Sequence, residues 1–397
     1  MQKLVSVIGL GYVGLPLSIC IANQGFKVIG VDSNSTKVKE INSGKSVIED
    51  VLDIQVREVI NSGFFKATTE YGESADSEIF LICVPTPLNY DGTPDLSFLM
   101  DAVIALGSII KKNSMVIIES TVSPGTTTQK LVPILERISG LSINDLDIAF
   151  SPERVDPSNK NWTLENTPKI VAGLTLQSRT RAVGFYKNFV NDVIECESIE
   201  VAEASKLLEN SFRLVNISFI NEFAIFCNKL GLSVSQVISA ASSKPYGFMP
   251  FYPSAGAGGH CIPVDPLYLL NSAHENGIEL GLIDLANKIN HEMPKHHVRR
   301  AESKIGNLKN KRVLIVGVAY KPNVSDIRET PAESLMSELK NKGALVYWHD
   351  ELVKEWNGST STPLNSAFDL AIIVTLHDYI EIKMLGEVPI INTKESV

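Results

Sequence analysis

The sequence lacks the features that would place the protein in a membrane or in a disulfide-bonded secreted class. No run of 18 apolar residues occurs in its 397 residues, so no transmembrane helix is predicted. The five cysteines are scattered and odd in number, which is typical of a reducing compartment rather than of a disulfide framework. No clean signal-peptide cleavage pattern follows the apolar N-terminus. We therefore expect a cytoplasmic protein.

Positive charge is also in short supply. Lys and Arg number 36 against 45 Asp and Glu, which gives a net charge of −9 at pH 7. This balance argues against nucleic acid and against an anionic membrane as the main partner. The length allows two or three domains, and a hydrophobic content of 44% allows each of them a sizeable core.

The beginning of the chain carries a glycine-rich turn between two strand-like segments. Residues 3–8 form an apolar run, GLGYVG follows at 9–14, and a second apolar run ends at Asp32. Strand, glycine turn, helix, strand and acid in this order are the fingerprint of a dinucleotide-binding unit. Asp32 is placed to bind the ribose hydroxyls and would repel a 2′-phosphate, so the predicted cofactor is NAD. The expected contacts are Gly9, Gly11, Tyr12, Val13, Gly14 and Asp32.

Polar loops follow three further buried strands of the predicted sheet. The strands at 78–84, 115–119 and 147–150 run into loops that contain Thr86, Thr121 and Glu153. In open parallel sheets, ligands bind beyond the carboxyl ends of the strands. These loops could be ordinary turns, but three in succession favour a binding site.

The rest of the chain predicts a helical middle and a second α/β unit. The pattern is helical from about Ile199 to Leu230, and strand–helix alternation resumes near Arg312. The expected fold is α/β, with two Rossmann-like doubly wound domains joined by a helical central domain with a long connecting helix. The expected domains are 1–198 for NAD, 199–300 for the centre and 301–397 for the substrate. The apolar residues of the long helix favour a homodimer.

Cys261 lies in the segment GAGGHCIPVDP, residues 256–266. Glycines let another group approach the thiol closely, and Asp265 can hold a water or take a proton. Such a thiol can be a nucleophile that forms a covalent intermediate, although a buried cysteine in a glycine turn would look the same.

Several motifs, taken in order, resemble the nucleotide-diphosphate-sugar 6-dehydrogenase family. They are GLGYVG, VPTP, STVSPGT, SPERV, the Glu203, Lys206 and Asn210 spacing, GGHCIPVDP, and the segment from Lys321 to Arg328. The resemblance covers nearly the whole chain. It implies a four-electron oxidation of a primary alcohol with two NAD⁺ and without a metal, through a thiohemiacetal and a thioester on Cys261.

The resemblance also implies roles for single residues. The family's catalytic positions match Cys261, Lys206, Asn210, Asp265, Glu153 and Thr121. The C-terminal unit is expected to bind the UDP moiety. The expected substrate contacts are Glu153, Lys206, Asn210, Tyr252, Gly258 and Lys321, and further cofactor contacts are Thr86, Thr121 and Arg328.

Two departures within the family point to the branch that acts on UDP-N-acetylhexosamines. Val264 stands where the UDP-glucose branch typically carries Lys, and Lys244 and Pro245 occupy the stretch where that branch brings an Arg from the partner subunit. UDP-GlcNAc is therefore the expected substrate. UDP-glucose, UDP-GalNAc and UDP-ManNAc remain alternatives, and the uronate products of this class commonly enter capsule or O-antigen.

Two other kinds of protein share some of these features. A two-electron dehydrogenase of the 3-hydroxy-acid kind would have the glycine fingerprint and a Lys–Asn pair, but it would not need Cys261 or a second α/β unit. A non-enzymatic sensor of sugar nucleotides would show no turnover and a thiol that is inert to alkylation. The stoichiometry of NADH per product separates these classes.

Overall fold

The structure is a computed structural model that describes residues 3–154, 156, 159, 161–365 and 367–395. The chain divides into two compact units. The first unit contains the chain up to Leu208 together with Leu267–Ser272, and the second contains Glu209–Pro266 and the chain from Ala273.

A single sheet organises the first unit. Its strand order is β3-β2-β1-β4-β5-β6-β7-β8, and the strands pair in parallel except for β6 with β7. Strands such as IFLI and MVII are apolar at every position because both faces of the sheet are covered. The strands are β1 (Leu4–Ile8), β2 (Lys27–Val31), β3 (Phe65–Thr68), β4 (Ile79–Ile82), β5 (Met115–Ile118), β6 (Asp147–Phe150), β7 (Lys169–Gly173) and β8 (Val193–Glu195).

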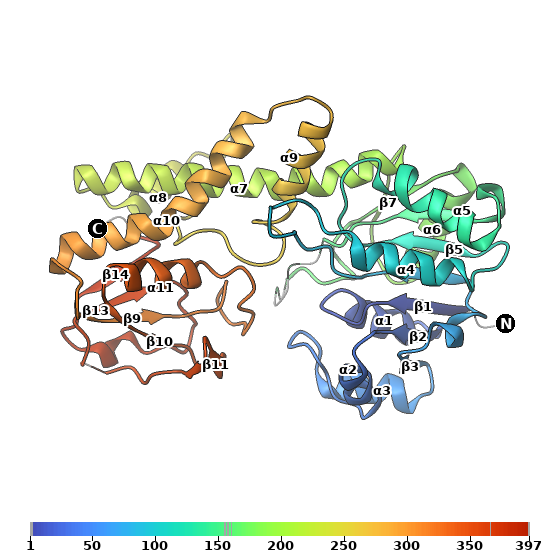
Figure 1. Cartoon of the computed structure of the whole chain (residues 1–397), viewed down its shortest axis with the longest axis horizontal. Coiled ribbons are helices and arrows are strands. Elements are labelled where there is room, and N and C mark those ends of the chain that lie inside the picture. Colours follow the sequence, from blue (N-terminus) through green and yellow to red (C-terminus); the bar gives the residue numbers. More distant parts are fainter. Residues whose placement is uncertain (1–2, 155, 157–158, 160, 366, 396–397) are drawn as a thin grey trace. The chain divides into compact units, whose positions relative to one another are not determined.

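Helices cover both faces of this sheet (Figure 1). Buried residues of α1, α3 and α6 form one core with the sheet, and residues of α4, α5 and the start of α7 form the other. These helices and α2 span α1 (Gly14–Asn23), α2 (Ser35–Asn42), α3 (Asp53–Asn61), α4 (Ser97–Gly107), α5 (Val132–Ser139), α6 (Leu176–Tyr186) and α7 (Ile199–Leu230). The order of the first six strands is that of a Rossmann sheet, in which strands are added on one side of β1 up to β3 and on its other side from β4 onward.

Most of α7 lies in the second unit, and three further helices precede that unit's sheet along the chain, of which α9 lies largely in the first unit. These are α8 (Val234–Ser242), α9 (Asp265–Glu275) and α10 (Gly281–Ile305). A small core joins Ile220, Ala224 and Cys227 of α7 to Val234 and Ile238 of α8. The rest of α7 in this unit keeps several large apolar side chains exposed.

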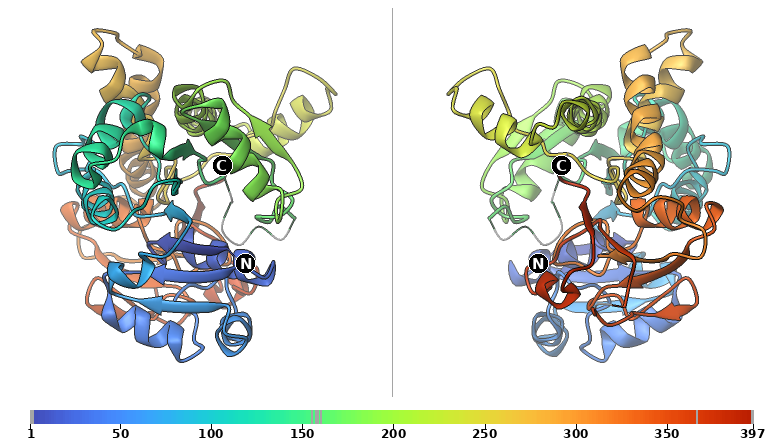
Figure 2. Two further views of the ribbon diagram at one scale, coloured as in Figure 1. Left: turned by 90° about the vertical axis from the view of Figure 1, so that its right-hand side faces the viewer. Right: turned by 90° about the vertical axis from the view of Figure 1, so that its left-hand side faces the viewer.

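A smaller parallel sheet ends the chain. Its order is β10-β9-β13-β14, and α10 and α11 pack over one of its faces (Figures 1 and 2). The other face is covered by residues such as Leu364, Phe368 and Leu385, which come from irregular segments and a 3₁₀ turn. The strands of this sheet and the helix over it are β9 (Arg312–Val316), α11 (Pro331–Asn341), β10 (Leu345–His349), β13 (Leu370–Ile373) and β14 (Ile390–Asn392). The short strands β11 (Glu355–Trp356) and β12 (Ser359–Thr360) pair with each other in a separate two-stranded sheet.

The predicted fold class is confirmed: along the chain, one Rossmann-like α/β part precedes and another follows a helical segment that contains the long helix α7. Within the described part of the chain, no helix combines the length and the apolar character that crossing a bilayer requires.

Candidate active site

The glycine turn after β1 has the shape that the sequence predicts. Gly9 has φ +91°, and a Cβ there would lie 2.8 Å from the Cys83 carbonyl oxygen. A Cβ on Gly14 would lie 1.8 Å from the Gly9 carbonyl oxygen, so both positions require glycine. A Cβ on Gly11 would instead project into open space. That space is where a pyrophosphate can approach the backbone.

The residues around this turn fit NAD. Helix α1 begins after Val13 without a side-chain cap and without an acidic residue in its first turn, so its N-terminal N–H groups can receive a phosphate. Asp32 follows β2, and its carboxylate accepts a hydrogen bond from the Leu10 amide at 2.9 Å. This bond fixes the acid beside the turn, where it can hold a ribose. Gly11, Tyr12, Val13 and Asp32 would therefore hold the cofactor.

Asp32 also has a partner that the sequence analysis missed. The Lys37 ammonium lies 2.9 Å from the Asp32 carboxylate. Lys37 is five residues further on, in the first turns of α2, so the cation comes from a neighbouring helix rather than from the residue next to the acid.

This pair gives a prediction about the cofactor. The wild-type protein is expected to prefer NAD⁺ strongly over NADP⁺, and Asp32→Ser to lower the NAD⁺/NADP⁺ ratio of kcat/KM by roughly tenfold or more. A hydrogen bond to a charged group contributes about 1.5–3 kcal/mol, and the variant leaves Lys37 available to a 2′-phosphate. Asp76→Ser, at an exposed acid paired with Lys111, is the control. Equal efficiency of both cofactors with the wild-type protein would contradict the prediction.

The loops after β4 and β5 are tied together by Tyr268, which the sequence analysis did not single out. Its buried hydroxyl donates to the carbonyl oxygens of Thr86 at 3.0 Å and Pro87 at 3.2 Å. Ser123 in turn donates to the Tyr268 carbonyl oxygen at 3.2 Å. Thr86 and Thr121 therefore follow adjacent strands, β4 and β5, in loops that share one anchor.

Glu203 anchors the loop after β5 from α7. Its buried carboxylate accepts the backbone N–H groups of Gly125 at 2.6 Å and Thr127 at 2.9 Å. Burial raises the pKa of Glu203 to about 7, while the hydrogen bonds from this loop act in the opposite direction. The spacing in the sequence had placed Glu203 with Lys206 and Asn210, but its contacts show that it positions a loop.

Lys206 lies one turn after Glu203 on α7 and is also buried. Its ammonium donates to the backbone carbonyl of Glu153 at 2.6 Å. Glu153 follows β6, and its own side chain is 15% exposed and lies 3.3 Å from the Lys169 ammonium. The first unit thus brings together two of the predicted catalytic residues, the main chain of one holding the cation of the other.

The second unit brings together Cys261, Asp265 and Asn210. Cys261 is half-buried and precedes the first turn of α9. Its backbone carbonyl accepts a hydrogen bond from the Asp265 backbone N–H at 2.9 Å. The Asn210 side-chain amide donates to the Asp265 carboxylate at 2.5 Å, and both residues are buried. Lys206 and Asn210 are four residues apart on one helix, so they share a face of α7.

The glycines before Cys261 pack against the segment that follows β9. The Gly259 amide donates to the Arg328 carbonyl at 3.1 Å. A Cβ on Gly258 would lie 2.7 Å from the Glu329 carbonyl oxygen, and a Cβ on Gly259, which has φ +85°, would lie 2.7 Å from the Tyr320 ring. Glycine is therefore required for the loop to approach this segment so closely.

Two residues of that segment were predicted to bind ligands. The Lys321 ammonium lies 6.0 Å from the centre of the Tyr320 ring. The Arg328 guanidinium forms an ion pair with Asp326 at 2.5 Å, which the sequence analysis did not foresee. Arg328 is 42% exposed, so this pair leaves part of its guanidinium accessible to solvent.

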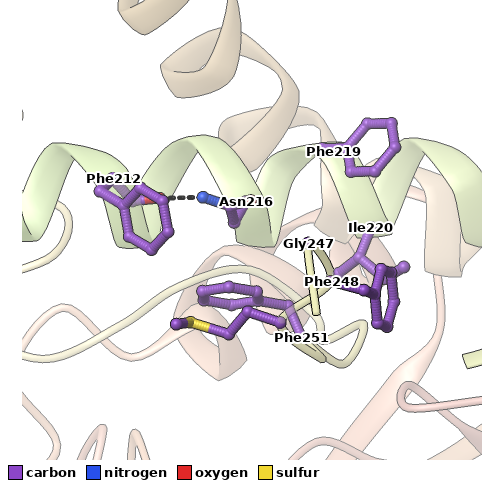
Figure 3. Close-up of a pocket in the computed structure, with 8 residues that line it drawn as sticks. Phe212, Asn216, Phe219, Ile220, Gly247, Phe248 and Phe251 are labelled. Carbon is purple, nitrogen blue, oxygen red and sulfur yellow. Dashed lines mark hydrogen bonds between the residues drawn. The ribbon is translucent and has the colours of Figure 1, made fainter. Parts of the chain in front are cut away.

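The remaining predicted substrate contact, Tyr252, is exposed and ends an apolar loop. The preceding residues Phe248, Met249 and Phe251 line an open groove of about 450 Å³ together with Phe212, Asn216, Phe219, Ile220 and Gly247 (Figure 3). One wall of the groove comes from α7 and the other from the loop, and the Phe212 and Phe251 rings meet edge to face at 5.9 Å. Tyr252 is not among the residues that line it.

Comparison with known families agrees with this geometry. The chain matches the NAD binding domain of the UDP-glucose/GDP-mannose dehydrogenase family over residues 3–190, its central domain over 200–292 and its UDP binding domain over 314–391. The match to the NAD binding domain confirms the predicted cofactor. The match to the UDP binding domain assigns UDP recognition to the C-terminal part.

Individual relatives cover most of the chain. A UDP-N-acetyl-D-mannosamine dehydrogenase from Campylobacter jejuni is 38% identical over 86% of this chain and 84% of its own length. A UDP-N-acetyl-D-glucosamine 6-dehydrogenase from Salmonella typhi is 36% identical over 84% of this chain and 79% of its own. The solved structure of a UDP-D-ManNAc dehydrogenase from Pyrococcus horikoshii aligns with a TM-score of 0.92 and 32% identity, covering 100% of this chain and 96% of that one. The chain is therefore an NAD-dependent UDP-sugar dehydrogenase and belongs to the UDP-glucose/GDP-mannose dehydrogenase family.

Proposed function

We propose that the protein oxidises the C6 hydroxymethyl group of a UDP-N-acetylhexosamine to the carboxylate. The observation that carries this proposal is the group formed by Cys261, Asp265 and Asn210, in which the backbone of a thiol residue is hydrogen-bonded to Asp265 and the Asn210 amide holds the Asp265 carboxylate. A two-electron dehydrogenase has no use for such a thiol, whereas an oxidation that continues to the acid needs a covalent hold on the aldehyde.

The first oxidation turns the alcohol into an aldehyde. Lys206 and Asn210 present an ammonium and an amide on one face of α7, and we assign to them the stabilisation of negative charge on the C6 oxygen. A preorganised donor aimed at such an oxygen commonly lowers the activation free energy by about 2.7–4 kcal/mol. NAD⁺, when bound, accepts the hydride that leaves C6 at each oxidation.

The second oxidation proceeds on the thiol. The Cys261 sulfur attacks the aldehyde carbon, which forms the Sγ–C6 bond and leaves a thiohemiacetal oxyanion. Loss of the hydride from C6 then gives a thioester. Water cleaves the Sγ–C6 bond, so the sugar leaves as a carboxylate and the thiol is regenerated. Thr121 and Asp265 are assigned to hold the water, and Glu153 to take its proton.

The C-terminal part supplies the nucleotide contacts. Lys321 and the backbone of Gly258 are assigned to the UDP-sugar, and Tyr252 lies at the end of the loop that leads to Gly258. We assign Arg328 to the cofactor pyrophosphate, which requires its guanidinium to exchange Asp326 for a phosphate or to contact both.

We also propose that the domains divide at 1–198, 199–300 and 301–397 and that the enzyme works in the cytoplasm.

The choice of sugar rests on Val264 and on the relatives. Val264 is buried and directly precedes Asp265. Because its side chain is apolar, it offers no charged donor to a bare 2-hydroxyl. Relatives of similar identity are named for UDP-N-acetyl-D-mannosamine and for UDP-N-acetyl-D-glucosamine, so both are candidates. UDP-GlcNAc remains the prediction from the sequence.

A substrate panel tests the proposal. Initial rates of NADH formation with UDP-GlcNAc, UDP-ManNAc, UDP-GalNAc and UDP-glucose are expected to show about 10- to 200-fold higher kcat/KM for an N-acetylated sugar, the range that one methyl-sized contact provides. Two NADH per sugar are expected for that substrate. A kcat/KM for UDP-glucose equal to or above those of all three N-acetylated sugars would overturn the choice, and one NADH per sugar would favour a two-electron dehydrogenase.

We propose a homodimer that covers the groove in Figure 3 with a second copy of the chain. Phe219 of α7 lines this groove together with apolar loop residues and is 59% exposed, and Phe226, two turns further along the helix, is 54% exposed. Contiguous apolar surface of this kind is typical of a protein–protein interface. A self-complementary face on a single long helix suits a twofold pair, because each copy then buries the same residues.

Sedimentation velocity at micromolar concentration is expected to show a dimer. Phe219→Glu combined with Phe226→Glu should shift it to monomer, because each buried aromatic anchor of an interface is worth about 2 kcal/mol or more. Phe98→Glu, at a 51% exposed position of α4, should leave the dimer intact. A wild-type protein that sediments as a monomer would refute the assembly.

A further inference from the structure

A buried lysine stands behind Glu153, and the antiparallel pairing of β7 with β6 puts it there. Phe150 pairs with Ala172 in this ladder. In an antiparallel pair, a residue three positions after Phe150 lies opposite the residue three positions before Ala172. Glu153 therefore lies opposite Lys169. Because β7 runs against its neighbour, its first residue lies at the edge where β4, β5 and β6 end.

Lys169 contacts two carboxylates at this edge. Its ammonium lies 2.5 Å from Glu119, which follows β5, and 3.3 Å from Glu153. The side chains of Lys169 and Glu119 are 5% and 0% exposed, whereas that of Glu153 is 15% exposed. The second oxygen of Glu119 accepts the hydroxyl hydrogen of Tyr186, which ends α6. Glu119 is thus fully engaged behind Lys169, and Glu153 is the member of the group that reaches solvent.

An ion pair this deeply buried is a weak source of stability, because removing two charges from water costs several kcal/mol for each ion. One carboxylate would suffice to neutralise Lys169, yet two contact it. The surplus negative charge therefore rests on the more exposed carboxylate, which is the one assigned to take a proton from water.

We propose that Lys169 is a positioning residue for Glu153: it fixes the carboxylate and keeps it ionised, while Glu119 and Tyr186 hold the ammonium from behind. This inference rests on the proposed role of Glu153 in thioester hydrolysis. It adds three residues to the reaction that none of the sequence motifs singled out, and none of the three is assigned a contact with substrate.

Burial raises the pKa of the Glu119 carboxyl, and the Lys169 ammonium acts in the opposite direction, so the ammonium favours the ionised form of Glu119. Burial alone would lower the pKa of Lys169, but the Glu119 and Glu153 carboxylates outweigh it and raise that pKa. Burial raises the pKa of the Cys83 thiol after β4 and of the Tyr186 phenol well above their ordinary values, so both are neutral at working pH. The Lys206 ammonium contacts the Glu153 main chain, and the Arg154 guanidinium donates to the Pro168 carbonyl at 2.8 Å.

The charges predict opposite effects for two substitutions. Lys169→Met removes the ammonium that lies 3.3 Å from Glu153, which disfavours the ionised form of Glu153 and moves the acidic limb of the kcat–pH profile upward. Glu119→Gln leaves Glu153 beside the ammonium alone and moves the limb downward. Each shift is expected to be about one pH unit or more, because a charge within about 4–6 Å changes a pKa by roughly 1–3 units. The double variant should fall between them.

The experiment combines pH profiles with a direct view of Glu153. The kcat–pH profile and the decay of the covalent enzyme–sugar adduct, followed by mass spectrometry, are measured for the wild type, Lys169→Met, Glu119→Gln and the double variant. Infrared difference spectra against Glu153→Gln report protonation of that carboxyl without any turnover. Lys111→Met, which breaks an exposed pair with Asp76, is the matched control and should shift nothing.

The outcomes are separable from those of the proposed function. One NADH per sugar with the wild-type protein would overturn the four-electron reaction, whereas the infrared titration would still measure how Lys169 and Glu119 act on Glu153. The positioning role would be overturned if the wild type makes two NADH per sugar but the acidic limb of the kcat–pH profile stays in place in Lys169→Met and Glu119→Gln. It would also be overturned if the limb moves in the same direction in both variants. An acidic limb that persists unchanged in Glu153→Gln would do the same.

Discussion

Cys261→Ser is expected to stop the reaction after the first oxidation. The serine hydroxyl is a far weaker nucleophile than a thiolate at neutral pH, so the aldehyde is not captured and the second hydride cannot leave. Formation of the uronate should fall by at least about 10³-fold, since loss of a covalent nucleophile has cost up to about 10⁶-fold in other enzymes. The measurement is NADH per sugar together with identification of the product by mass spectrometry.

The same experiment has a matched control in this chain. Cys196 is another half-buried thiol, but it lies directly after β8 and outside the predicted site, so Cys196→Ser should keep two NADH per sugar. Cys196→Ser is a matched control for Cys261→Ser because both changes replace one sulfur by oxygen. A Cys261→Ser protein that makes the uronate with two NADH at the wild-type rate would remove Cys261 from the mechanism.

Local patterns in the sequence were sufficient to predict the central strands of the first sheet and the long helix. The apolar runs that became β1, β2, β4, β5 and β6 lie within one or two residues of the predicted segments, because strands buried on both faces are apolar at every position. The helix expected from Ile199 to Leu230 has these bounds in the structure. The glycine turn could also be predicted in detail, since its shape depends on the turn itself rather than on distant residues.

Long-range contacts could not be predicted in this way. Lys169 begins a strand that the sequence analysis did not identify, and it meets Glu119 and Glu153 only because β7 runs antiparallel to β6. Tyr268 and Glu203 act through backbone groups of distant loops, which no spacing in the sequence reveals. The available signal in the sequence for the group of Lys169, Glu119 and Glu153 was a lysine at the start of an apolar segment. A charge that costs several kcal/mol to bury points to a partner nearby.

Lys206→Met is expected to lower kcat by about 10²–10³-fold, the cost of removing one preorganised donor to a developing oxyanion. Methionine keeps the length and the apolar stem of lysine but loses the ammonium. Because the charge on the C6 oxygen develops in the transition state, KM for the UDP-sugar should change little while kcat falls. Steady-state kinetics with saturating NAD⁺ separates the two parameters.

A structural effect of this substitution can be recognised and set apart. The Lys206 ammonium also holds the Glu153 carbonyl at 2.6 Å, so Lys206→Met leaves a buried acceptor without its donor and should cost about 1–3 kcal/mol of folding stability. Thermal unfolding measures that loss, and kinetics taken well below the transition exclude it from kcat. Lys229→Met, at an exposed position in the last turn of the same helix, controls for the loss of a lysine from α7. A kcat within threefold of the wild type in a folded Lys206→Met protein would show that this ammonium does not stabilise the reacting oxygen.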